Sequence, residues 1–276
     1  MSKIQLKKLL IRSPILILIF FSLFFLIFNV FLFTQEEVIL YYTVKSLITK
    51  KDTTDLQKLE RVIDFINKNI YFNEGKKGFF RANPMEILNK ETGGQCGEFS
   101  RITIVLLSKL RIPSHRIYLF TFNKQGKLYS NHVMVEALID NNWILVDPMY
   151  KMIFFDPESC KFYNSSVKDP ELYRKIVDTF PGISLNRCNA PNVFIYSYPI
   201  DYDNFSNNSL VHWQRFPAGK SIHYLFRIFF PKREDDISMP LVFERPYLLK
   251  IIFYFVLFLI LSAVYLELLS REKKVF

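Results

Sequence analysis

Two long apolar runs dominate the pattern of hydrophobic and polar positions along the chain. The first covers residues 15–33, interrupted only by Ser22 and Asn29, and the second covers residues 247–266, with Lys250 near its start. About 20 apolar residues in a helix are enough to cross the hydrocarbon core of a bilayer. A lysine near a helix end can extend its amine to the interface. Both runs are therefore predicted to be transmembrane helices.

A cleavable signal peptide is the alternative interpretation of the first run, because a basic segment precedes it. The apolar core is longer than the about 7 to 15 residues of a signal peptide, and Thr34-Gln35-Glu36-Glu37 follows where a small-residue cleavage site would lie. An uncleaved anchor is the prediction. The basic residues of this segment are Lys3, Lys7, Lys8 and Arg12.

These basic residues also predict the orientation of the chain. Positive charge is retained on the cytoplasmic side of a membrane, so residues 1–14 are predicted to be cytoplasmic and residues 35–245 extracytoplasmic. The second crossing returns residues 267–276, which carry three more basic side chains, to the cytoplasm. The prediction is a two-pass membrane protein with both termini cytoplasmic and one main domain outside, large enough to bury a single core.

Helical periodicity marks three segments of that domain. Residues 56–70 present apolar side chains on one face, after a polar cluster in which Thr53 or Thr54 can cap a helix. In residues 99–110 apolar side chains recur at steps of three and four, and a third helix is predicted around residues 169–180. A continuation of the first apolar helix is predicted for residues 36–50.

Strands are predicted in the middle of the domain. Residues 116–123 and 130–139 are separated by a turn at 124–127, and residues 143–147 form the returning strand. Residues 193–230 are rich in aromatic side chains and broken by Asn, Asp and Pro. They are predicted to form irregular strands and long loops.

The register of the two later strands can be predicted by counting. A two-residue turn at 140–141 pairs Ile139 with Asn142 and places His132 diagonally from Asp147 on the same face. Side chains can close the separation of about 7 Å between such positions. A slip of one residue would send the two to opposite faces.

Charge and cysteine content narrow the class of protein. The formal charge is +10, but no nucleic-acid-binding motif is present, so we expect no nucleic acid partner and attribute the charge to topology and anionic lipid. The cysteines are Cys96, Cys160 and Cys188. A disulfide between Cys160 and Cys188 would leave Cys96 free, and three unpaired thiols are the alternative.

Cys96 stands where a helix is predicted to begin. Gly93 and Gly94 allow a tight turn before it, and the free N–H groups of the first helical turn favour a thiolate. A thiolate nucleophile requires a base and an orienting group, for which His132 and Asp147 are the candidates.

Four ordered segments resemble the transglutaminase-like superfamily. Together they cover roughly residues 56–150. The segments are Gly94-Gln95-Cys96-Gly97-Glu98-Phe99, Leu110-Arg111-Ile112-Pro113-Ser114-His115-Arg116, His132-Val133-Met134-Val135-Glu136 and Asn142-Trp143-Ile144-Leu145-Val146-Asp147-Pro148.

The resemblance implies an α+β, papain-like core in which a helix bearing the cysteine packs on an antiparallel sheet. It further implies that Cys96 is the nucleophile, His132 the base and Asp147 the orienting acid. The thiolate would attack an amide or peptide carbonyl to give a thioester, which an amine or water then releases. The Cys96 N–H would face the oxyanion, and the Gln95 side chain is a second candidate for that position.

The chain departs from the family pattern at Met134, where many members carry tryptophan. No carboxylate cluster suggests calcium activation, and the histidines show no zinc-ligand spacing, so neither a cofactor nor a metal is expected. Glu98 and Glu136 are assigned capping or solvent-facing roles in preference to acid/base work.

Two hypotheses follow. In the first, a membrane-anchored thiol enzyme acts on amide bonds of a protein, peptide or cell-envelope polymer, by transfer or hydrolysis. In the second, an inactive domain of the same fold serves as a membrane-tethered binding or assembly module.

Overall fold

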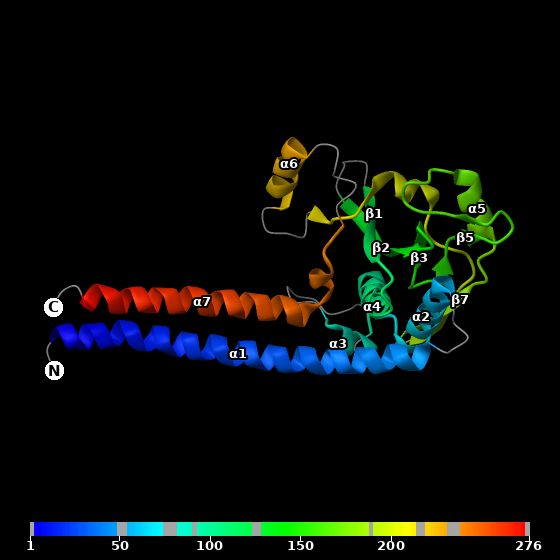
Figure 1. Cartoon of the computed structure of the whole chain (residues 1–276). Coiled ribbons are helices and arrows are strands. Elements are labelled where there is room, and N and C mark those ends of the chain that lie inside the picture. Colours follow the sequence, from blue (N-terminus) through cyan, green and yellow to red (C-terminus); the bar gives the residue numbers. More distant parts are fainter. Residues whose placement is uncertain are drawn as a thin grey trace. The chain divides into compact units, whose positions relative to one another are not determined.

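The computed structural model describes eight stretches of the chain, and it divides the chain into two compact units (Figure 1). One unit consists of residues Met1–Ile39 and Arg245–Phe276, and the other of Leu40–Glu244. The described stretches are residues 3–48, 54–73, 82–89, 93–122, 128–187, 190–213, 219–230 and 238–273.

The first unit is a pair of long apolar helices. Helix α1 (Lys3–Leu47) continues from this unit into the second, and helix α7 (Pro246–Lys273) follows the domain. Both are long and apolar enough to cross a membrane. The predicted spans therefore lie inside longer helices, because no helix breaker separates residues 15–33 from the sequence that follows them.

The two helices run antiparallel, as their contacts show. The rings of Phe25 and Tyr254 stack with centroids 5.4 Å apart, and Arg245 Nη2 lies 2.9 Å from Glu36 Oε1. Residue numbers thus fall along α1 as they rise along α7, so the two chain ends lie at the same end of the pair (Figure 1). Polar side chains within α1 donate hydrogen bonds to backbone carbonyls of the same helix. Asn29 Nδ2, for example, donates to the Phe25 carbonyl at 2.7 Å.

The second unit combines helices with an antiparallel sheet, which is the predicted α+β fold. Thr54 caps α2 by accepting from Gln57 N, as the polar cluster predicted, and Asn83 caps α3 by accepting from Glu86 N at 2.9 Å. Its helices are α2 (Asp55–Asn69), α3 (Pro84–Leu88), α4 (Cys96–Lys109), α5 (Pro170–Asp178) and α6 (Gly219–Phe229), with 3₁₀ turns η1 (Tyr202–Asn207) and η3 (Leu241–Glu244).

The main sheet has five strands in the order β4-β3-β2-β1-β9. Strands β2 and β3 pair Ile139 with Asn142, which confirms the predicted register. The turn between them holds Asp140 and Asn141 at φ 49° and 64°, a left-handed conformation that these side chains tolerate. The strands are β1 (Ser114–Phe122), β2 (Leu128–Ile139), β3 (Asn142–Asp147), β4 (Met152–Ile153) and β9 (Asn208–Ser209).

Helix α4 and the sheet enclose the core. The buried face of α4 includes Phe99, Ile102 and Leu106, which are at most 2 % exposed. Ser100, fully buried, donates its hydroxyl to the Val133 carbonyl of β2 at 3.0 Å. That bond fixes the helix bearing Cys96 against the strand bearing His132.

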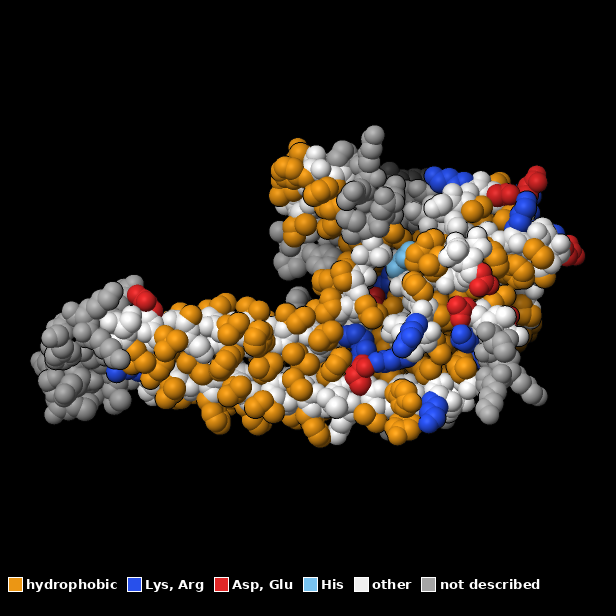
Figure 2. Space-filling view, viewed as in Figure 1, with side chains coloured by type: hydrophobic (Ala, Val, Ile, Leu, Met, Phe, Trp, Pro, Cys, Tyr) orange, Lys and Arg blue, Asp and Glu red, His pale blue; other side chains and the backbone are white. Residues whose placement is uncertain are grey.

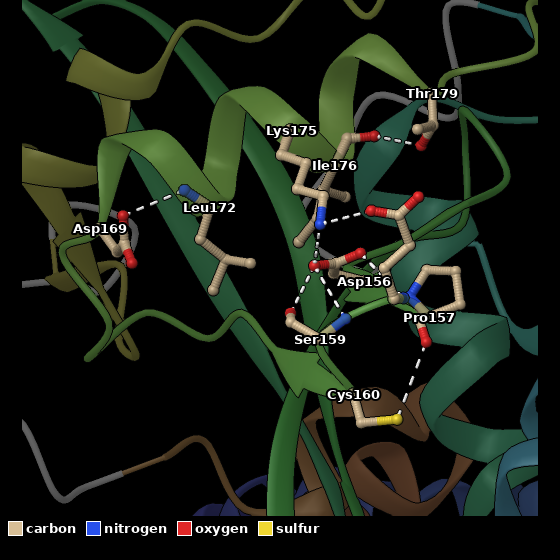
Figure 3. Close-up of polar contacts among 10 residues, drawn as sticks. Asp156, Pro157, Ser159, Cys160, Asp169, Leu172, Lys175, Ile176 and Thr179 are labelled. Carbon is tan, nitrogen blue, oxygen red and sulfur yellow. Dashed lines mark hydrogen bonds and ion pairs between the residues drawn. The ribbon is translucent and has the colours of Figure 1, made fainter.

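Two small hairpins flank this core, β5 (Phe155–Asp156) with β6 (Lys161–Phe162) and β7 (Ile183–Arg187) with β8 (Ala190–Ile195). Figure 3 shows the turn of the first, where Asp156 accepts from Ser159 and from Lys175 of α5, the latter at 2.9 Å. Hydrogen bonds from Ser159 and Lys175 lower the pKa of Asp156 to about 2.

Two expectations for the domain require comment. Residues 219–229 form helix α6, so the prediction of strands and loops throughout residues 193–230 was wrong there. Cys160 is an exposed free thiol whose Sγ lies 3.7 Å from the Pro157 carbonyl oxygen, which favours the alternative without a disulfide. Cys188 and the predicted turn at 124–127 lie outside the described residues.

Candidate active site

Cys96 is the first residue of α4, and the chain enters the helix through a tight turn. Gly93 has φ 50°, and a Cβ there would lie 2.4 Å from the Tyr71 carbonyl oxygen. Gly94 N donates to the same oxygen at 2.9 Å, and the Gly94 carbonyl accepts from Asn73 N at 3.0 Å. Only glycine at position 93 allows the backbone to come this close to the Tyr71 carbonyl. The two hydrogen bonds of Gly94 tie the chain just after α2 to the start of the cysteine helix.

Glu98 completes the helix entrance. Its Oε2 accepts from the Gln95 backbone N at 3.1 Å, and a Cβ at Gly94 would lie 2.3 Å from the Glu98 Cβ. Glu98 therefore has the capping role that the sequence suggested. Gln95 itself is exposed.

His132 lies between Cys96 and Asp147. Its Nε2 is 2.6 Å from Asp147 Oδ2, and its ring is near enough to the Cys96 side chain for each group to shift the pKa of the other. The geometry thus brings together the three residues that the sequence singled out.

Asp147 is fully buried and held by four donors. Its Oδ2 accepts from His132 and from the Tyr198 hydroxyl at 2.8 Å, while Oδ1 accepts from the backbone N of Met149 at 3.1 Å and of Tyr150 at 3.3 Å. Asp147 fixes the orientation of the imidazole as well as supplying a negative charge.

The charges of the cluster favour a thiolate and an imidazolium. Burial by itself lowers the pKa of His132, but the charge and hydrogen bond of Asp147, together with Cys96, raise that pKa to about 10. Burial raises the pKa of Cys96, yet the hydrogen bond and charge of His132 and the Val133 backbone N–H lower it below its usual range. The first turn of α4 adds the positive end of a helix dipole.

A buried ion cluster supports α4 one turn beyond the cysteine. Arg101 Nε lies 3.3 Å from Glu244 Oε2, and Arg116 of β1 donates from Nε and Nη2 to the same carboxylate. Arg101 also donates to the Ala82 carbonyl at 2.7 Å. The charges of Arg116 and Arg101 keep the pKa of Glu244 below its usual range although burial raises it.

The other candidate residues lie elsewhere. Glu136 pairs with His115 at 2.9 Å and lines a cavity of about 700 Å³ with Trp143 and with Ser108 near the far end of α4. Glu136 is buried, so the solvent-facing role was wrong for it. Met134 is fully buried. Among the residues that the structure describes, no three His, Cys, Asp or Glu side chains gather as a metal site.

Sequence reasoning missed Tyr198 and Glu244. Tyr198 lies 51 positions after Asp147 and Glu244 lies 128 positions after Arg116. Neither belongs to a periodic pattern or to the four quoted segments. The one available signal was Arg116, at the start of the strand predicted for residues 116–123. A buried arginine needs a carboxylate partner, but the sequence does not say which one.

A sequence model described as "Transglutaminase-like superfamily" matches residues 42–148. A solved structure described as "a Putative Cysteine Protease from Cytophaga hutchinsonii" is 20 % identical to this chain. The match covers 42 % of this chain and 37 % of the solved chain, with a TM-score of 0.32. No curated protein matches the chain.

The matched residues include the three candidate catalytic side chains but not Tyr198, which donates to Asp147. Cys96, His132 and Asp147 all lie between residues 42 and 148, on the helix and the two strands that the four quoted segments form. The mixed helix and antiparallel sheet of this region agree with that match. Residues 42–148 therefore form a transglutaminase-like domain.

Proposed function

We propose that this protein is a membrane-anchored thiol enzyme that cleaves or transfers acyl groups from amide bonds of a protein, peptide or cell-envelope polymer. The observation that supports this most directly is that His132, hydrogen-bonded to Asp147, lies beside Cys96 at the start of α4 and lowers the pKa of its thiol. A structural cysteine does not require a buried imidazole and carboxylate aligned behind it.

The reaction follows from the charges of the cluster. The Cys96 thiolate attacks the carbonyl carbon of the substrate, and the Cys96 backbone N–H at the helix start is positioned to stabilise the oxyanion. As the C–N bond breaks, His132 gives its proton to the departing amine and leaves a thioester on Cys96.

The second half of the reaction releases the acyl group. His132, now neutral, takes a proton from water or from an incoming amine, which attacks the thioester and restores the thiolate. Asp147, hydrogen-bonded to His132, keeps the imidazole in one orientation and one tautomer. Water gives hydrolysis and an amine gives transfer.

Acylation of Cys96 by a small ester tests this proposal. Mass spectrometry after treatment with p-nitrophenyl acetate should find the acetyl group on Cys96, and hydroxylamine should remove it. His132→Ala should reduce the acylation strongly. The exposed thiol of Cys160 serves as a reference in the same molecule. Equal acylation of Cys96 with and without His132 would favour a non-catalytic binding module.

We further propose that α1 and α7 span the membrane and that residues 40–244 lie outside the cytoplasm. The antiparallel helix pair and the basic residues at both chain ends support this orientation. A membrane-impermeant maleimide should label Cys160 of intact cells. It should label a cysteine introduced by Ser2→Cys only after permeabilisation, and the reverse pattern would overturn the orientation.

A further inference from the structure

Helix α6 presents a stripe of large apolar side chains to solvent. Ile222, Leu225, Ile228 and Phe229 are 48 %, 52 %, 55 % and 69 % exposed. Their spacing places them on one side of the helix. Figure 2 shows orange side chains gathered where Figure 1 labels α6. A soluble surface rarely exposes four such neighbours without a partner.

The opposite side of α6 is already occupied. Trp213 stacks on His223 with centroids 5.2 Å apart and lies 5.8 Å from the ring of Phe226. Within the described part of the chain, α6 makes no extensive contact with another helix or strand. Its packing against Trp213 therefore fixes which side faces outward.

The sequence around α6 is basic. Residues 213–233 contain no acidic side chain, and an acidic run at residues 234–236 begins only after them. A basic segment with an apolar face is typical of helices that lie in the interface of an anionic bilayer, where aromatic side chains are also favoured. The five basic residues are Arg215, Lys220, Arg227, Lys232 and Arg233.

The chain length also fits a membrane as the partner. Only residues 230–245 separate α6 from α7. That linker can reach at most about 58 Å when extended, so α6 stays within this distance of the bilayer that α7 would cross.

A second copy of the chain is a poorer partner. An 11-residue helix is about 16 Å long and offers roughly 250 Å² on one side. A stable protein interface needs about 800 Å² from each partner.

We propose that α6 lies in the headgroup region of an anionic membrane, with its apolar stripe toward the acyl chains. The inference rests on the membrane anchoring proposed above. It adds a third lipid contact to the two spans, through a segment that lies outside the family match. Such a contact restricts how far the 40–244 unit can move from the bilayer.

Quenching by brominated lipid tests the position of the stripe. The chain has two tryptophans, so Trp143→Phe with Trp213→Phe allows a single reporter to be placed by Phe229→Trp. We reconstitute this full chain in vesicles of phosphatidylcholine and phosphatidylglycerol with bromine near the headgroup end of the acyl chains. Fluorescence should fall about twofold, and Ile222→Gln with Leu225→Gln should abolish the loss.

The matched control places the tryptophan at Tyr196, which is exposed on the same unit, and it should not be quenched. Flotation of the vesicles in alkaline carbonate tests the two spans separately. A chain that floats but is not quenched overturns the role of α6 and leaves the anchoring intact, whereas a chain that does not float overturns both. A shift of oligomeric state in detergent on Leu225→Gln would identify a second copy as the partner and would also overturn the proposal.

Discussion

Replacing Asp147 by Asn should make Cys96 an ordinary thiol. The substitution keeps the shape of a fully buried side chain but removes the negative charge that lies 2.6 Å from His132 Nε2. Without that charge, burial becomes the main influence on the pKa of His132, and it lowers this pKa and favours the neutral ring. The thiolate then loses the imidazolium that lowers the pKa of Cys96.

The structure sets the size of the effect. The pKa of His132 is raised from its ordinary 6.5 to about 10, which corresponds to roughly 5 kcal/mol of preference for the imidazolium. Two unit charges about 3 Å apart in a medium of effective dielectric constant 20 interact by a similar amount. Cys96 supplies part of this preference, so we expect Asp147→Asn to slow alkylation at neutral pH by about 10- to 100-fold.

The assay is timed alkylation with iodoacetamide, with the Cys96 and Cys160 peptides quantified separately by mass spectrometry between about pH 5 and pH 10. In the parent protein the rate at Cys96 should rise at a pH below the ordinary thiol value, because its pKa is lowered. In Asp147→Asn the rise should move to higher pH. The rate at Cys160 should be the same in both.

Asp156→Asn is the matched control. Asp156 is also buried and also accepts several hydrogen bonds, but it lies in the hairpin turn that carries Cys160 and not beside Cys96 (Figure 3). The substitution should leave the profile of Cys96 unchanged. The reasoning would be refuted by superimposable Cys96 profiles in the parent and in Asp147→Asn, provided that thermal unfolding shows the variant to be folded.

Three further changes test the surroundings of the site. Tyr198→Phe removes one donor to Asp147 and should cost about 1–3 kcal/mol of unfolding free energy and slow alkylation less than Asp147→Asn does. Glu244→Gln leaves Arg116 buried without its counter-charge and should cost about 3–5 kcal/mol. Gly93→Ala forces an L side chain to φ 50° and should cost about 1–3 kcal/mol. Chemical denaturation measures all three.

The exposed carboxylate of Glu158 provides a control for Glu244, because Glu158→Gln should change stability by at most about 0.5 kcal/mol. Equal effects of the two substitutions would contradict the structural role of the buried cluster. An unaltered unfolding midpoint in Gly93→Ala would show that the turn before Cys96 is not constrained as described.

The central sheet could be predicted because its signals are local. Asp140 and Asn141 accept a left-handed turn, and that turn sets the register of β2 and β3 without help from the rest of the chain. Alternation then places His132 and Asp147 on one face. The cap at Thr54 is local in the same sense. These features depend on residues within a few positions of each other.

Helix α6 was missed because its surroundings suggested loops. Its apolar residues do recur at helical steps, but only over 11 residues, within a segment that is rich in aromatic side chains and broken by Pro and Asn. In so short a window the helical period competes with composition. The exposure of the stripe could not be read from the sequence, since the same pattern is typical of a helix that packs on a core.

The long-range contacts explain why the family pattern alone does not account for the position of the nucleophile. The cysteine helix is tied to the end of α2 through the Tyr71 carbonyl, to β2 through Ser100, and to the segment before α7 through Arg101 and Glu244. Glu244 lies nearly 100 residues beyond the matched region. Tyr198, one of the four donors to Asp147, lies about 50 residues beyond it. Because His132 lowers the pKa of Cys96 only when the two side chains are held close together, variation in the C-terminal half of the domain should alter the reactivity of Cys96 even where the four motifs are unchanged.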